Sequence, residues 1–203
     1  MKPLLISASS YSRGGKNTFC SLVSAELKTR FNIDAYQLSF AHQLRVDTQD
    51  FLKKCGFDVW SDEDKEMFRP VLIWYASLKR KETNGRYFLD KTKEWMERTK
   101  HRYDVFLLSD LRFKQNSEYD ELDWCLSSGP VVHISKYKLI NGLKHFDTPP
   151  NQLEATNDPI IKAAATFRIE WEDSDGDTTK LDSHIKTFVN WLDQNKYLDG
   201  RKK

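Results

Sequence analysis

The chain has 203 residues, of which 39% are hydrophobic and 13% aromatic, enough to build a core, so disorder of the whole chain is excluded. Its length suits one compact domain spanning residues 1–203. Its 32 basic and 30 acidic residues leave a net charge of +2, which argues against a dense basic surface for nucleic acids.

The N-terminal segment predicts a strand, a turn and a helix in succession. Residues 3–8 are an apolar run without clean alternation, as in strands buried on both faces. A turn with two glycines, Gly14 and Gly15, follows, and from Lys16 onward apolar residues recur at helical spacing. This order of elements is the one that a phosphate-binding loop requires.

The middle of the chain predicts one strand and then a series of helices. Residues 35–40 are a plausible strand, and residues 41–55 have apolar side chains on one helical side. A helical stripe follows over residues 67–78, is broken at Asn84-Gly85, and precedes a further helix over residues 88–97.

The second half of the chain predicts three more strands and a closing helix. Strands are expected at residues 105–109, 130–135 and 167–171, and an amphipathic helix at 181–198. Residues 136–158 are polar, contain glycine and prolines, and are expected to form a loop or lid. Alternating strands and helices predict an α/β fold with a doubly wound parallel sheet, whose ligands bind beyond the C-terminal strand ends.

The turn after the first strand resembles a phosphate-binding loop of the form Gly, four residues, Gly-Lys and Ser or Thr. Ser10 stands at the first glycine position, and the hydroxyl residue arrives one place late. Backbone amides around the glycines can approach phosphate oxygens, and Lys16 can reach the outer phosphates of a nucleoside triphosphate. Residues predicted to bind ATP phosphates are Ser12, Arg13, Gly14, Gly15, Lys16, Asn17 and Thr18.

A second candidate site follows the strand at residues 105–109. Asp110 stands at its C-terminal end, where a carboxylate can hold magnesium through water or orient an acceptor, or can simply cap a helix. With Thr18, or less favourably Asn17, it is the predicted Mg²⁺ site. Arg112 can pair with Asp110 or clamp a phosphate, and the sequence does not separate these alternatives.

The motifs together resemble the bacteriophage deoxynucleoside monophosphate kinases, members of the nucleoside monophosphate kinase superfamily with the P-loop NTPase fold, and the related animal-type phosphomevalonate kinases. The shared blocks are Ser12–Thr18, Leu38-Ser39-Phe40-Ala41 with Leu44-Arg45, Lys65 with Arg69, and Ser109–Phe113 with Asn116. The sequence departs from this family at Ser10, and at Ala76-Ser77, where the family tends to have a Leu-Gly turn.

The resemblance implies transfer of the γ-phosphoryl group of ATP to a (deoxy)nucleoside monophosphate. Catalytic roles then fall to Lys16, Arg13 and Asp110, and acceptor binding to Arg45, Arg69 and Arg112, with the helical region 41–100 around the acceptor. Lys136 and Lys138 are the candidate lid cations, although an ordinary solvated loop explains them as well. Glu154 lies where the family often has an acid after the lid, and the sequence assigns it no role.

Three rival functions stay open on the sequence alone. They are a phosphomevalonate-type kinase, a nucleotide-binding regulator without turnover, and a nucleic-acid 5′-kinase, which the near-neutral charge disfavours. We expect ATP and a nucleoside monophosphate as partners and no stable nucleic-acid partner. A homodimer is a candidate assembly, although the sequence does not reveal the oligomeric state.

The cysteines and the apolar runs indicate the cellular location. Cys20, Cys55 and Cys125 lack the spacing of a zinc site and are expected to be free thiols, as in a reducing compartment. Leu4-Leu5-Ile6 is too short for the core of a signal peptide, and no run reaches the length of a membrane span. We therefore expect a cytoplasmic protein, located in the host cytoplasm if it is viral.

Overall fold

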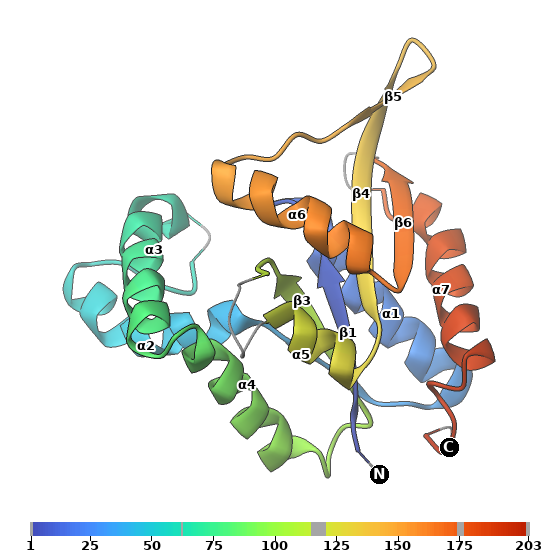
Figure 1. Ribbon diagram of the computed structural model, residues 1–203, viewed down its shortest axis with the longest axis horizontal. Coiled ribbons are helices and arrows are strands. Elements are labelled where there is room, and N and C mark those ends of the chain that lie inside the picture. The colour runs from blue at the N-terminus through green and yellow to red at the C-terminus, as the bar shows by residue number, and fades with distance from the viewer. Residues whose placement is uncertain (1, 62, 115–120, 174–176, 202–203) are drawn as a thin grey trace.

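A computed structural model describes residues 2–61, 63–114, 121–173 and 177–201. Within them, parallel strands pair in the order β2-β3-β1-β4, β6 continues the sheet in parallel beyond β4, and β5 pairs antiparallel with the far end of β4 (Figure 1). The strands are β1 (Leu4–Ser9), β2 (Ala35–Leu38), β3 (Val105–Leu111), β4 (Val131–Ile140), β5 (Leu143–Phe146) and β6 (Phe167–Glu172).

Helices cover both faces of this sheet. One face packs against α1 and α7, and the other against α4, α5 and α6, while α2 and α3 stand beside the sheet (Figure 1). The helices are α1 (Lys16–Phe31), α2 (Phe40–Lys54), α3 (Lys65–Glu82), α4 (Arg86–Thr99), α5 (Glu121–Ser128), α6 (Gln152–Ala164) and α7 (Asp182–Gln194), with a short 3₁₀ turn η1 (Thr179–Leu181) before α7. The predicted α/β fold with a doubly wound parallel sheet is confirmed.

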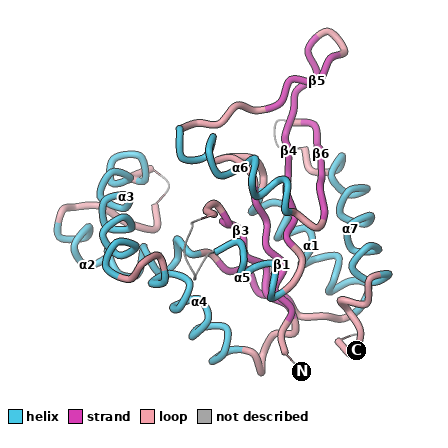
Figure 2. The backbone as a smooth tube through the Cα atoms, viewed as in Figure 1, coloured by secondary structure: helices cyan, strands magenta, loops and turns pink. Residues whose placement is uncertain are grey.

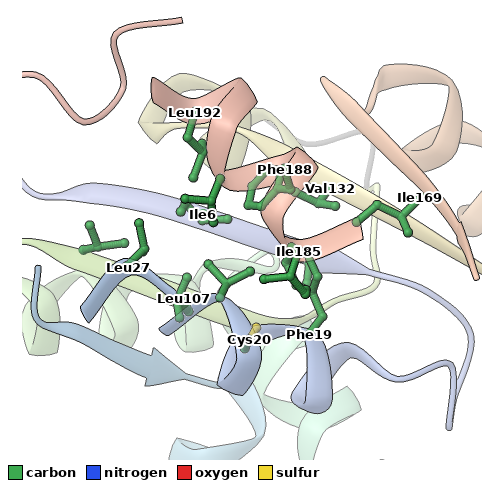
Figure 3. Packing of buried hydrophobic residues seen from close by; sticks show 14 of the residues in the cluster. Ile6, Phe19, Cys20, Leu27, Leu107, Val132, Ile169, Ile185, Phe188 and Leu192 are labelled. Carbon is green, nitrogen blue, oxygen red and sulfur yellow. The ribbon is translucent and has the colours of Figure 1, made fainter. Parts of the chain in front are cut away.

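The central strand β1 is buried on both faces, which explains its continuous apolar sequence. Ile6 points into the core formed with α1 and α7, whereas Leu5 belongs to the core on the opposite face. Figure 3 shows Ile6 in the same cluster as Phe19 and Phe188, and the ring centroids of the two phenylalanines lie 5.3 Å apart. Burying a side chain of this size contributes about 2–3 kcal/mol, so both layers fix the position of β1 and of the loop that follows it.

Helices α2 and α3 share a small core of their own. Leu52, Val59 and Phe68 form a buried cluster separate from the two large ones. The predicted acceptor region 41–100 corresponds to α2, α3 and α4, and Tyr87 of α4 donates a hydrogen bond to Asp47 of α2 at 2.9 Å.

The prediction of a loop over residues 136–158 is wrong. Strand β4 runs on to Ile140, Asn141 and Gly142 both have positive φ angles (52° and 79°), and β5 returns as the second strand of a hairpin (Figure 2). An Asn-Gly pair in this conformation favours such a two-residue turn. In Figure 1 the hairpin projects away from the sheet.

Helices α5 and α6 were also missed by the sequence analysis. Helix α6 contains Pro159, and its first turns contain Thr156 and Asn157, which are poor helix formers in isolation. Asn151 caps the helix instead, because its side chain accepts a hydrogen bond from the Glu154 amide at 2.9 Å. The second predicted strand is shorter than expected, since Ser39 is the N-cap of α2 and Phe40 its first residue.

Candidate functional site

The turn between β1 and α1 leads from a central strand to the start of a helix and is tightly packed at both glycines. Gly15 has a φ of 86°, and a Cβ there would lie 2.1 Å from the ring of Trp171. A Cβ on Gly14 would lie 1.8 Å from the hydroxyl of Ser10. Ser10 therefore occupies space that Gly14 leaves free, which explains how the loop closes without a glycine at its first position.

Lys16, the first residue of α1, is folded back over this loop. Its ammonium group donates hydrogen bonds to the carbonyl oxygens of Ser10 at 2.8 Å and Tyr11 at 2.7 Å. Burial and, to a smaller extent, the positive charge of Arg112 lower the pKa of Lys16 to about 8, against the opposing effect of the carboxylates of Glu154, Asp110 and Asp158. A phosphate group beside this ammonium would relieve the cost of burying its charge.

A carboxylate from α6 contacts the same loop. One oxygen of Glu154 accepts a hydrogen bond from the backbone amide of Ser12 at 2.7 Å, and the other accepts from Arg112 at 3.1 Å. Arg112 thus pairs with Glu154 and not with Asp110. Glu154 has no predicted role, although the capping pattern Asn151-x-x-Glu154 is a signal for a helix start that places it in the first turn of α6.

Asp110 lies at the tip of β3 and holds the start of α2. Its carboxylate accepts hydrogen bonds from the amides of Phe40 and Ala41, both at 2.9 Å, and from the hydroxyl of Ser39 at 2.8 Å. These donors belong to the open end of a helix, where a negative charge is favourable. The sequence allows Asp110 either a role in binding magnesium or the acceptor, or a role as a helix cap. These contacts match the helix cap.

The fit of Mg²⁺ to this site depends on Thr18 and Asp110. Within the described ranges the Thr18 hydroxyl has no hydrogen-bond partner, and it is half-buried in the first turn of α1. Both oxygens of Asp110 already accept hydrogen bonds, so an ion would reach it through water. No cluster of three or more His, Cys, Asp or Glu side chains that could hold a metal occurs in the part of the chain that the structure describes.

A cavity of about 360 Å³ opens beside the loop, between β2, α2 and α4. The guanidinium of Arg45 lies over the ring of Trp60, 5.6 Å from its centroid. The rings of Tyr36 and Trp95 lie together with centroids 4.5 Å apart. Residues that line the cavity include Asn17, Tyr36, Gln37, Ser39, Gln43, Arg45, Trp60, Lys91, Thr92 and Trp95.

The remaining predicted arginines are not gathered in one place. Arg45 lines the cavity, and Arg13 is exposed on the loop with a φ of 64°. Arg69 pairs with Glu66 on its own helix and is not among the residues lining the cavity. These contacts are those of an ordinary surface arginine. The resemblance also invoked Asn116, which lies outside the described residues.

The predicted lid lysines are paired with nearby carboxylates. Lys136 donates to Asp173 at 3.0 Å and lies 3.8 Å from Asp147, and Lys138 lies 3.6 Å from Asp173. Both lysines are on β4, so the hairpin holds them beside the loop that follows β6. In this conformation they neutralise local carboxylates.

The described helices include none that is long and apolar enough to cross a membrane. No family model matches the chain, and no curated protein matches it significantly.

Three solved structures of shikimate kinases are distantly similar to the chain. The enzyme from Aquifex aeolicus is 17% identical, with 97% of this chain and 100% of that chain covered and a TM-score of 0.43. The one from Bacteroides thetaiotaomicron is 11% identical, with 94% and 98% covered and a TM-score of 0.46. The one from Acinetobacter baumannii, solved with shikimate, is 14% identical, with 96% and 95% covered and a TM-score of 0.44. A likeness this distant does not identify what this chain binds.

Proposed function

We propose that this chain transfers the terminal phosphoryl group of ATP to a (deoxy)nucleoside monophosphate. The observation that carries the proposal is that the loop holding the buried Lys16 adjoins a separate cavity of about 360 Å³. Asn17, the residue after Lys16, lines that cavity. Phosphoryl transfer needs a donor phosphate and an acceptor held end to end, and two adjoining sites supply that arrangement.

The donor half of the proposal rests on the loop. Amides around Gly14 and Gly15 would face the phosphates of ATP at the positive end of α1, and Lys16 would turn from its carbonyl partners to the outer phosphates. The exposed Arg13 and the partly exposed Arg112 are the nearest further cations of the predicted set. Charge on the transferring group would be stabilised mainly by these residues.

The acceptor half rests on the cavity. Its volume is near the lower end of the range of about 300–1,000 Å³ that small-ligand pockets span, which favours a small acceptor. Aromatic rings such as Trp95 can stack on a base, and Arg45 can pair with the acceptor phosphate. An ionised phosphate is already a nucleophile, so this transfer needs little help from a general base.

We expect Mg²⁺ to take part, with Thr18 as a ligand and Asp110 reached through water. A bound ion would neutralise charge on the donor phosphates. The α2–α3 region would surround the acceptor, and the β4–β5 hairpin with α6 would form the lid.

An acceptor panel tests the proposal. ATP with each common and modified nucleoside monophosphate, in ribose and deoxyribose forms, should give ADP with a subset of acceptors in a coupled assay. Phosphomevalonate belongs in the same panel, because a kinase for it would use the same donor site. The aromatic lining of the cavity favours a base, so ADP formation with phosphomevalonate alone would contradict the nucleotide acceptor.

Lys16→Ala is the first variant to measure. We expect the transfer rate to fall at least ~100-fold, because the variant loses the charge nearest the transferring group. Lys28→Ala is the matched control, since Lys28 lies on the same helix and forms an exposed ion pair with Asp34. A Lys16→Ala variant that keeps its transfer activity would contradict the proposed donor site. Tight ATP binding by the unaltered chain without transfer to any acceptor would favour the nucleotide-binding regulator.

A further inference from the structure

The carboxylate of Glu154 bridges the loop between β1 and α1 and the guanidinium of Arg112. It accepts from the Ser12 amide at 2.7 Å and from Arg112 at 3.1 Å, and its residue is only 8% exposed. A loop amide and a guanidinium are also the two donor types that bind phosphate oxygens most often. Glu154 therefore makes, within the chain, the contacts that a phosphate group makes with such a loop.

The helix that carries Glu154 is fixed to the sheet by its next turn. The side chain of Asn157 accepts a hydrogen bond from the Lys114 amide at 2.8 Å, and Asp158 pairs with the buried His133 at 3.0 Å. Burial raises the pKa of Tyr11 in the loop, and the negative charge of Asp158 raises it further. Two α6 carboxylates thus face the loop, and the contacts of Asn157 and Asp158 anchor the second turn of the helix, beyond the first turn that carries Glu154.

The charges around Lys16 indicate what happens when a donor arrives. Lys16 is surrounded by the carboxylates of Glu154, Asp110 and Asp158 and by one cation, Arg112. Phosphates brought to the same loop would meet the Glu154 carboxylate at close range, where like charges repel. The Ser12 amide has one hydrogen to donate, so it cannot keep a full bond to Glu154 while it binds a phosphate oxygen.

We propose that Glu154 is an internal anion that competes with the donor phosphates and sets the affinity of the loop for ATP. Donor binding transfers the Ser12 amide and Arg112 from Glu154 to a phosphate oxygen, and the first turn of α6 moves away from the loop. This inference rests on the proposed function, because it takes ATP as the ligand of the loop.

The test compares ATP dissociation constants by calorimetry for the unaltered chain, Glu154→Gln and Glu97→Gln. A glutamine keeps the size and the acceptor oxygen but removes the charge, so we expect Glu154→Gln to bind ATP about tenfold more tightly. Glu97, exposed on α4 and paired with Lys100, makes the same charge change away from the loop and should leave the affinity unaltered.

A merely structural role predicts the opposite sign. If Glu154 only braces the loop, its replacement loosens the site and ATP binding weakens. Unchanged or weaker ATP binding by Glu154→Gln, with an intact thermal transition, overturns the inference. If that variant does not fold, Glu154→Asp, which shortens the side chain and keeps the charge, should also bind ATP more tightly by losing reach to Ser12, and weaker binding overturns the inference in the same way.

The same ATP-binding measurements distinguish a failure of the proposed function from a failure of this inference. Absence of ATP binding in both the unaltered chain and Glu154→Gln overturns the proposed function and the inference together. ATP binding by the unaltered chain with no gain in Glu154→Gln overturns only the inference. ATP binding found only in Glu154→Gln supports both.

Discussion

Gly15 lies at the end of the loop between β1 and α1 with a φ of 86°, and the ring of Trp171 occupies the space where a Cβ would project. Gly15 is therefore constrained both by its left-handed backbone conformation and by the lack of space for a side chain. A side chain in the left-handed region costs about 1–2 kcal/mol, and forcing atoms into a packed site costs a further ~1–3 kcal/mol. Trp171 comes from β6, so the loop is shaped partly by a strand about 155 residues later in the chain.

Gly15→Ala should therefore lower the free energy of unfolding by about 2–5 kcal/mol in urea denaturation. Gly56→Ala is a matched control, because Gly56 has the same φ of 86° but no atom within 4 Å of its added Cβ. The control should lose only the ~1–2 kcal/mol of backbone strain. Equal losses in the two variants would contradict a role for Trp171 in shaping the loop.

At the scale of elements, the strand–loop–helix unit of the phosphate loop was predictable because its signals are local. Burial on both faces makes β1 apolar throughout, and Gly14-Gly15-Lys16 gives the loop its chemistry. The start of α2 was harder to predict from the sequence, because Ser39 and Phe40 continue the alternation of polar and apolar residues in β2. Asp110, a residue on another strand, accepts hydrogen bonds from the first two amides of the helix and so supports its start there, together with the N-cap Ser39.

Helix α6 was missed for a related reason. Its sequence contains Pro159, and its burial against the loop comes from polar residues, Glu154, Asn157 and Asp158. Ile161 is the one hydrophobic side chain among the four buried residues that the structure describes in this helix, so its hydrophobic periodicity is weak. The partners that satisfy those side chains lie at Ser12, Lys114 and His133, and only the folded sheet brings them together.

Asp110→Asn tests whether the capping of α2 is the main role of this carboxylate. The amide group puts a donor against the Ser39 hydroxyl or the helix amides, so we expect the free energy of unfolding to fall by about 1–3 kcal/mol. We also expect a higher KM for the acceptor, because α2 carries Arg45, and little change in ATP affinity.

Ser39→Ala provides the comparison for this prediction. It removes the hydroxyl that donates to Asp110 at 2.8 Å and accepts from the Ala41 amide at 3.1 Å, so its loss should be smaller, about 0.5–2 kcal/mol. A different result for Asp110→Asn, with stability retained and a raised Mg²⁺ requirement, would support the metal role predicted from the sequence.

At the scale of the whole molecule, the loop joins separate parts of the fold. It follows β1 in the centre of the sheet, contacts Glu154 of α6 and Trp171 of β6, and adjoins the cavity bordered by α2 and α4. A ligand that binds the loop only in the folded chain therefore stabilises the whole fold. At 100 times its dissociation constant, ATP should add about 2.7 kcal/mol to the free energy of unfolding.

For a chain of 203 residues this stabilisation corresponds to a rise in Tm of about 5–10 °C at pH 7, measured by calorimetry with and without ATP. The rise should shrink as pH increases through about 8, because Lys16 has its pKa lowered to about 8 and then loses the charge that attracts phosphate.

Without ATP, the contribution of Lys16 to the stability of the fold changes with pH in the opposite direction. Between pH 8 and the ordinary lysine value of 10.5, the unfolded chain holds the proton that folded Lys16 has released, so this residue makes folding more favourable as pH rises. A Lys16→Ala chain should show neither the pH-dependent loss of the ATP-induced rise in Tm nor the gain in stability of the free chain between pH 8 and 10.5. A shift in Tm with ATP that stays constant from pH 7 to pH 9.5 would show that the Lys16 ammonium is not the group that binds the phosphates.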